Sequence, residues 1–220
     1  MKAGRPADAD PPWLTGPVNE ILLIRHGETT WSAAHRHTSY TDLELTPDGE
    51  RQARALAPLL AGRRFARVLS SPRQRATRTA ALAGLAVDAI EPDLAEWHYG
   101  EYEGRTSADI QTERPGWSIW TDGGPGGESP EQVGARLDRV LDRVAPLLEQ
   151  GDVALVGHGH SLRVLGARWI GLPPSAGGLL RLDTATLSVL GHEHGRRVIR
   201  RWNLPAPPTG ADDPGRSARH

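Results

Sequence analysis

Two histidines in this sequence each follow a run of apolar residues. Ile21–Ile24 leads directly into Arg25 and His26, and far downstream Val153–Val156 leads, after a glycine, into His158. A neutral imidazole nitrogen can attack phosphorus and form a covalent intermediate. A guanidinium group binds the oxygens of a phosphoryl group through parallel hydrogen bonds. These residue types therefore indicate phosphoryl binding or phosphoryl transfer.

The two apolar runs have the character of strands that are buried on both faces of a sheet. In open α/β sheets, ligands bind in the crevice beyond the carboxyl ends of the strands. Each run is followed by a His-Gly pair, at residues 26–27 and 158–159. We therefore expect His26 and His158 to face each other in one pocket.

A second arginine and a set of carboxylates complete the candidate site. Arg75 lies about one turn into the helix that is expected after residues 70–72. With Arg25 it gives the pocket two permanent cations, which suit a tetrahedral dianion. A leaving alkoxide also needs a proton from a carboxylic acid. Spacing alone does not choose among the three glutamates of the following segment, Glu96, Glu101 and Glu103.

Alternating strand and helix patterns predict the fold class. Thr46 and Pro47 have the residue types of a helix start, as does Ser129. We expect a three-layer α/β/α fold with a mostly parallel open sheet, helices on both faces and an antiparallel edge hairpin. The expected strands are 21–24, 66–69, 86–90 and 152–156, the helices run from Pro47 to Leu60, from Pro72 onward, from Ser129 through Val144 and over 161–170, and the hairpin pairs 184–190 with 197–202 through 191–195.

The chain is expected to form one domain with a tail at each end. Residues 1–18 and 204–220 are rich in proline and in aspartate or glycine, which is typical of segments without a packed core. The domain is then residues 19–203. Within it, residues 94–127 are polar and aromatic and end in a glycine-rich turn. A connection of this length favours a lid-like insertion with a functional role.

Composition excludes several classes of function. The 220 residues suit one large domain, and the net charge of -1 gives no general attraction to nucleic acid or to acidic membranes. The chain has no cysteine, which excludes thiol nucleophiles and zinc–thiolate sites. No apolar run approaches the roughly 20 residues of a membrane span, and no secretory signal is recognisable. We expect a cytoplasmic protein without nucleic-acid or membrane partners.

Four ordered motifs resemble the histidine phosphatase (phosphoglycerate mutase-like) superfamily. The resemblance extends from about Glu20 to Trp202. Further motifs around Glu96 and His158, and the Trp117–Gly123 stretch, are similar to the sedoheptulose-1,7-bisphosphatase branch. The four motifs are Arg25-His26-Gly27-Glu28-Thr29, Ser71-Pro72-x-x-Arg75-Ala76-x-x-Thr79, Glu96-x-x-x-Gly100-x-x-x-Gly104 and His158-Gly159-x-Ser161-Leu162-Arg163.

The resemblance implies a role for each candidate residue. His26 would be the nucleophile that becomes phosphohistidine, with Arg25, Arg75 and His158 holding the phosphoryl oxygens. Glu96 would donate the proton to the leaving group and later activate water. The resemblance also implies a set of substrate-binding residues at the mouth of the pocket: Ser32, Thr38, Ser39, Tyr99 and His160.

The preferred interpretation is a phosphoric monoester hydrolase acting on small phosphorylated substrates, such as sugar phosphates, without metal or other cofactor. A phosphoglycerate mutase is the first alternative; the segment between Glu96 and His158 lacks a convincing match to the mutase's basic substrate-gripping insertion. A catalytically silent phosphate-binding module of the same fold is another. Three His-x-His pairs, at 35–37, 158–160 and 192–194, leave a metallohydrolase as a third. The assembly could be a homodimer.

Overall fold

The computed structural model describes residues 19–206. Its centre is a six-stranded sheet in the order β3-β2-β4-β1-β5-β6. The strands β3, β2, β4 and β1 are parallel, whereas β5 runs antiparallel to β1 and to β6. The strands are β1 (Ile21–Arg25), β2 (Phe65–Ser70), β3 (Ala89–Ile90), β4 (Asp152–Gly157), β5 (Thr186–Glu193) and β6 (Arg196–Pro205).

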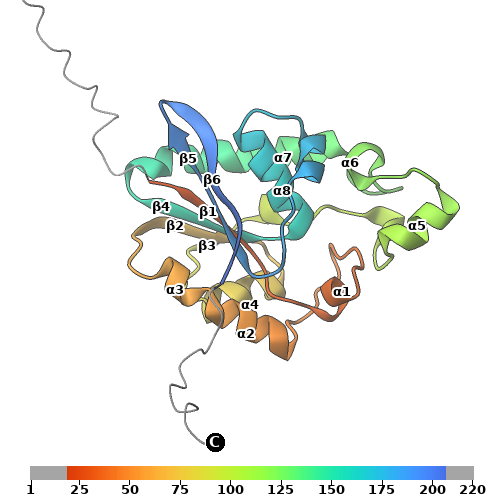
Figure 1. Ribbon diagram of the computed structural model, residues 1–220, viewed down its shortest axis with the longest axis horizontal. Coiled ribbons are helices and arrows are strands. Elements are labelled where there is room, and N and C mark those ends of the chain that lie inside the picture. The colour runs from red at the N-terminus through yellow and green to blue at the C-terminus, as the bar shows by residue number, and fades with distance from the viewer. Residues whose placement is uncertain (1–18, 207–220) are drawn as a thin grey trace, which may run out of the picture.

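Helices cover both faces of the sheet, so the molecule has three layers (Figure 1). The longest helix, α7, lies with α8 on one face, and α2, α3 and α4 lie on the other. This confirms the predicted fold class. The helices are α1 (Thr30–Ala33), α2 (Pro47–Ala55), α3 (Ala57–Leu60), α4 (Gln74–Leu82), α5 (Ser107–Glu113), α6 (Ile119–Asp122), α7 (Pro130–Val144) and α8 (Gly159–Trp169), with short 3-10 turns at Pro92–Leu94, Gly100–Tyr102, Ala145–Glu149 and Pro174–Leu179.

The central strands β1 and β4 are apolar between Ile21 and Ile24 and between Val153 and Val156, because both of their faces are covered. Successive side chains of a strand point to opposite faces of the sheet. Ile21 and Leu23 of β1 therefore pack in the core below α7 and α8, while Leu22 and Ile24 pack in the core against α2 and α4. All four of these side chains are fully buried.

Two predicted elements have different limits in the structure. The helix expected from Pro47 to Leu60 is divided at Leu56 into α2 and α3. Pro58 explains the division, because its nitrogen has no hydrogen to donate to the carbonyl of Arg54. The strand predicted at 86–90 is only Ala89–Ile90. Just before it, Asp88 bonds Val68 twice, donating its N–H to the Val68 carbonyl and accepting the Val68 N–H with its side chain.

The edge hairpin turns later than predicted. Strand β5 continues to Glu193, and only His194 and Gly195 form the turn. Both have positive φ, 48° and 76°, the conformation of a two-residue hairpin turn whose twist matches that of the strands. The connection was expected to start at residue 191 and starts at residue 194, so the prediction is wrong by three residues there.

The aromatic segment 94–127 is folded and packed rather than irregular. It contains α5 and α6. Trp97, Tyr99 and Trp117 are buried in the same apolar core as α7 and α8. Whether the segment moves as a lid stays a prediction.

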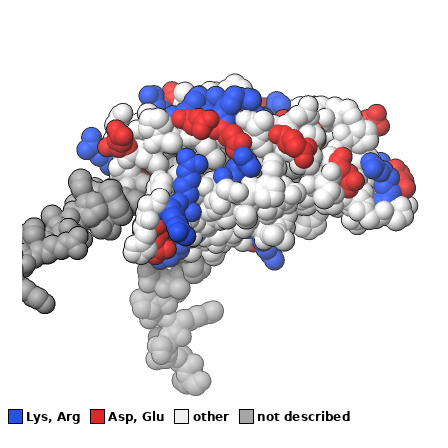
Figure 2. Space-filling view, turned by 90° about the horizontal axis from the view of Figure 1, so that it is seen from above, with Lys and Arg blue, Asp and Glu red and all other residues white. Residues whose placement is uncertain are grey.

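The predicted N-terminal tail, residues 1–18, lies outside the described residues, as does most of the predicted C-terminal tail. Strand β6 includes Leu204 and Pro205, which that prediction assigned to the tail. Over residues 19–206 no helix combines the length and the hydropathy that crossing a membrane requires. Acidic and basic side chains are interspersed on the face shown in Figure 2.

Candidate active site

The parallel strands bring three chain segments to one edge of the sheet. Arg25, the last residue of β1, is paired with Gly157, the last of β4, and Ser70 of β2 is paired with Val156. The residues that follow these three strand ends are therefore neighbours. They include both histidines of the predicted site.

The His26 ring is in the state that nucleophilic attack requires. Its Nδ1 lies 2.7 Å from the carbonyl oxygen of Gly27, which can only accept a hydrogen bond. Nδ1 therefore carries the hydrogen and Nε2 carries the lone pair. Burial, together with the nearby positive charges of Arg75 and Arg25, holds the pKa of His26 well below its ordinary value. The ring is thus neutral at physiological pH.

The His158 ring lies beside the His26 ring, with 5.1 Å between the ring centroids. Its Nδ1 accepts a hydrogen bond from Nε of Arg75 at 3.2 Å, so its hydrogen is on Nε2. That nitrogen donates to the hydroxyl of Ser71 at 2.6 Å. Burial and the charge of Arg75 also lower the pKa of His158 well below its ordinary value. Both nitrogens of this ring are therefore engaged by the protein.

Arg75 is a fully buried cation at the start of α4. Besides His158, its guanidinium donates to the carbonyl oxygens of Thr38, Ser39 and Thr41 at 2.9–3.2 Å. The nearest carboxylate is that of Asp42, 4.0 Å away. Burial lowers the pKa of Arg75. The side chain thus places a cation next to both imidazoles and ties the 38–41 loop to them.

Arg25 has a donor that the protein does not use. One of its terminal nitrogens donates to the carbonyl of Leu182, but its buried Nε has no hydrogen-bond partner among residues 19–206. Gly159 makes room for this side chain, because a Cβ at that position would lie 3.3 Å from the guanidinium carbon. A buried unpaired donor costs free energy unless an acceptor occupies the site.

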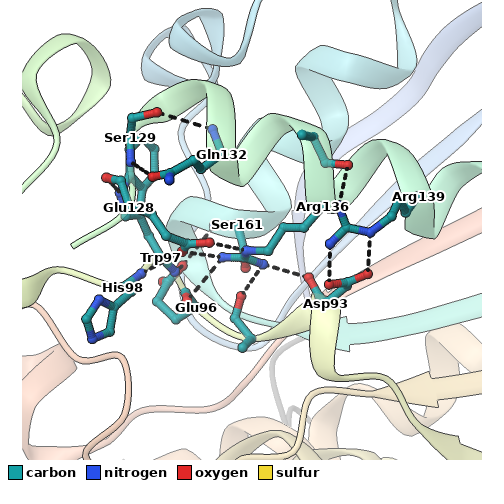
Figure 3. Close-up of polar contacts among 12 residues, drawn as sticks. Asp93, Glu96, Trp97, His98, Glu128, Ser129, Gln132, Arg136, Arg139 and Ser161 are labelled. Carbon is teal, nitrogen blue, oxygen red and sulfur yellow. Dashed lines mark hydrogen bonds and ion pairs between the residues drawn. The ribbon is translucent and has the colours of Figure 1, made fainter. Parts of the chain in front are cut away.

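Glu96 lies at the N-terminus of α8, close to Ser161 (Figure 3). Its Oε1 accepts the backbone N–H groups of Trp97 and Ser161 at 2.9 and 2.8 Å. Its Oε2 accepts one, that of His160 at 3.0 Å. Oε2 therefore has the spare lone pair that can take up and release a proton. The side chain is 6% exposed.

These groups line a small cavity of about 230 Å³. Arg25, His26 and Glu96 are among its lining residues. Arg75 and His158 are not part of the lining; they lie buried behind it. The remaining lining residues are Ser32, His35, Arg36, His37, Thr38, Tyr99, Ser107, Gly159, His160, Arg163 and Leu182.

Four of the five predicted substrate-binding residues line the cavity. Ser32 and Thr38 are among them, and the Tyr99 hydroxyl and Nδ1 of His160 form a hydrogen bond of 2.7 Å. Burial raises the pKa of Tyr99 and lowers that of His160, so both rings stay neutral. Ser39 differs: it is buried and its hydroxyl donates to Glu103. Ser39 is therefore not among the residues that line this cavity, and its role in substrate binding stays a prediction.

Two further side chains that line the cavity, His37 and Arg163, are not among the predicted site residues. His37 bonds the hydroxyl of Ser107 at 3.2 Å, and burial lowers its pKa to about 4. Arg163 stacks on Trp120 and donates to two backbone carbonyls. Arg163 closes one of the four motifs and could have been found there; His37 belongs to a His-x-His pair. Over residues 19–206, no three or more His, Asp or Glu side chains are grouped so as to hold a metal ion.

Comparisons with known proteins identify relatives of this chain. The family model described as histidine phosphatase superfamily (branch 1) matches residues 21–205. An acid phosphatase of Mycobacterium tuberculosis is 42% identical over 183 residues, covering 82% of this chain and 90% of the relative. A sedoheptulose 1,7-bisphosphatase of Saccharomyces cerevisiae is 35% identical over 184 residues, covering 69% and 67%. The solved structure of the open reading frame Rv3214 of Mycobacterium tuberculosis superposes with a TM-score of 0.83 at 40% identity, covering 86% of this chain and 99% of that one.

Proposed function

The chain belongs to the histidine phosphatase superfamily and is a phosphoric monoester hydrolase, and on this premise we propose that it hydrolyses small sugar phosphates through a phosphohistidine on His26. The state of His26 carries the proposal. It is a neutral ring, with its lone pair on Nε2, in the wall of a cavity shared with Arg25 and Glu96.

In the first step, Nε2 of His26 attacks phosphorus as the bond from phosphorus to the leaving oxygen breaks. The transition state spreads charge over the equatorial oxygens, and fixed cations stabilise it. Arg25 lines the cavity, and its Nε, which has no partner among residues 19–206, is available as a donor to one of these oxygens. Arg75 and His158 also bind the phosphoryl oxygens once these oxygens replace their present partners. For Arg75 these partners are carbonyls of the 38–41 loop, and for His158 the partner is the Ser71 hydroxyl.

Glu96 serves both steps. It first gives the proton on Oε2 to the leaving alkoxide, which departs as an alcohol. The resulting carboxylate then takes a proton from water while that water attacks phosphorus and the phosphorus–nitrogen bond breaks. Inorganic phosphate leaves, and both His26 and Glu96 return to their starting states.

The other residues that line the cavity favour a small hydroxylated substrate. Ser32, Thr38 and the Tyr99–His160 pair offer polar groups, and Arg163 adds a positive charge. A cavity of about 230 Å³ has room for one small phosphate ester. The relative named sedoheptulose 1,7-bisphosphatase also favours a sugar phosphate over a larger substrate.

The proposal is tested by trapping the intermediate. We expect wild-type protein mixed with ³²P-labelled p-nitrophenyl phosphate, then denatured in alkali, to carry label on His26. His26→Ala should take up no label and release no p-nitrophenol. His98→Ala, at an exposed histidine, is the control and should label like wild type. Label that persists in His26→Ala would contradict the proposal.

A further inference from the structure

The segment that carries Glu96 has little regular structure to hold it. After the 3-10 turn at Pro92–Leu94, residues 95–99 form neither helix nor strand. The Glu96 carboxylate is fixed to α8 by backbone N–H groups. Its backbone needs a separate support, because a catalytic acid must be held within about 0.5 Å of its productive position.

That support comes from Arg136, a buried side chain of α7 (Figure 3). One terminal nitrogen donates to the carbonyls of Asp93 and Ala95 at 2.6 and 2.8 Å. The other donates to the carbonyl of Glu96 itself at 3.2 Å. The planar guanidinium thus fixes three carbonyls on and just before the residue that would transfer the proton.

Glu128 fixes the other side of the same segment. Its carboxylate accepts two hydrogen bonds from Arg136, at 2.8 and 3.1 Å, and a third from the N–H of His98 at 2.9 Å. Its backbone exchanges two more with the segment: its carbonyl accepts from the indole of Trp97 and its N–H donates to the carbonyl of His98. The Arg136–Glu128 pair therefore holds residues 93–98 by hydrogen bonds both before and after Glu96.

We propose that the Arg136–Glu128 ion pair is a positioning device for the catalytic acid, an inference that rests on the proposed role of Glu96. Glu96 then lies between two helices: α8 holds its carboxylate, and α7 holds its backbone through this pair. Arg136 touches no reacting atom. Its contribution is to keep Oε2 aligned with the leaving oxygen, so its loss weakens protonation of the leaving group.

Leaving-group dependence separates this role from a purely structural one. p-Nitrophenolate leaves without a proton, whereas the alkoxide of glycerol 3-phosphate needs one. We expect Glu96→Gln to lower kcat/KM for glycerol 3-phosphate far more than for p-nitrophenyl phosphate, because kcat/KM reports only the steps up to phosphorylation of His26. Arg136→Gln should change the ratio of the two kcat/KM values in the same direction, with about a 10–100-fold loss on glycerol 3-phosphate. Arg136→Lys, which keeps the charge but not the fork, should show a smaller shift of the same sign.

Arg139 provides a matched control on the same helix. It is exposed and binds the carboxylate of Asp93 and the carbonyl of Ala135, but no group of residues 95–98. Arg139→Gln should leave both kcat/KM values unchanged. Glu128→Gln gives a second, milder test, because an amide oxygen in the place of Oε2 still accepts from Arg136 and from the N–H of His98; it should shift the ratio less than Arg136→Gln. Thermal unfolding of each variant gives the folded fraction by which the rates are corrected.

Equal losses on both substrates, or no loss on either, in folded Arg136→Gln or Glu128→Gln would overturn the inference while Glu96→Gln keeps its leaving-group dependence. If Glu96→Gln itself slows both substrates equally, the proposed role of Glu96 fails instead. The two failures are therefore distinguishable.

Discussion

The two His-Gly units of this protein, residues 21–27 and 153–159, are alike in sequence and opposite in use. Each is a buried central strand followed by histidine and glycine. In the first unit, His26 keeps a lone pair on Nε2 and lines the cavity. In the second, Arg75 and Ser71 occupy both nitrogens of His158. The comparison teaches that hydrogen-bond partners, not the local motif, decide which imidazole can act as a nucleophile.

The largest expected difference between the two units is in turnover. His26→Asn removes the proposed nucleophile and should lower kcat for every phosphomonoester by at least about 10⁴-fold. His158→Asn removes one donor behind the His26 ring and should cost about 10²–10³-fold. Steady-state rates with p-nitrophenyl phosphate, on variants shown to be folded by circular dichroism, measure both. Similar losses in the two variants would contradict the different roles of His26 and His158.

The two glycines should differ in a smaller way. A Cβ on Gly27 would lie 2.3 Å from the backbone oxygen of Gly49, and backbone cannot move aside. Gly27→Ala should therefore destabilise the fold by about 2–3 kcal/mol. On Gly159 the nearest atoms belong to the Arg25 side chain, which can shift. Gly159→Ala should leave stability within about 1 kcal/mol of wild type and lower kcat/KM about 10-fold by displacing that donor. Urea unfolding and kinetics check the pair; a stable Gly27→Ala would refute the close approach.

The smallest expected effect is on the pH dependence of stability, to which His26 and His158 should contribute about equally. The pKa values of His26 and His158 are lowered in the folded state, so below the ordinary value of 6.5 the unfolded chain binds more protons than the folded one. The free energy of unfolding therefore falls as pH drops from 6.5, by up to about 1.4 kcal/mol per pH unit for each histidine. His26→Asn and His158→Asn should flatten this slope by similar amounts. Denaturant unfolding at pH 7, 6 and 5 measures it, and unchanged slopes in both variants would argue against neutral buried rings.

Much of the sheet was predictable because burial leaves a local mark. Strands covered on both faces are apolar throughout, so the β1 and β4 runs stand out in the sequence. The helix break at Pro58 also has a local cause, yet the apolar spacing over residues 53–60 masks it. The two-residue strand β3 and the hairpin turn depend on individual hydrogen bonds, which periodicity does not specify.

Arg136 shows a signal that was present but ambiguous. It lies three residues after Val133 and four before Val140, on the apolar face of its helix. A charged residue at such a position must find partners, since burying an unpaired charge is costly. The sequence does not say which partners, because Glu128 and the carbonyls of 93–96 reach it only after α7 has packed on the sheet.

By itself, the sequence determined that two strand ends deliver histidines to one edge of a parallel sheet, with arginines nearby, because strand burial and strand direction follow from local patterns. Only the tertiary structure decided which histidine keeps its lone pair, which carboxylate oxygen is spare, and that Ser39 does not line the cavity. The reason is the range of the contacts: Ser71 and Arg75 meet His158 across 87 and 83 positions of the chain, and no local pattern encodes which groups meet at such separations.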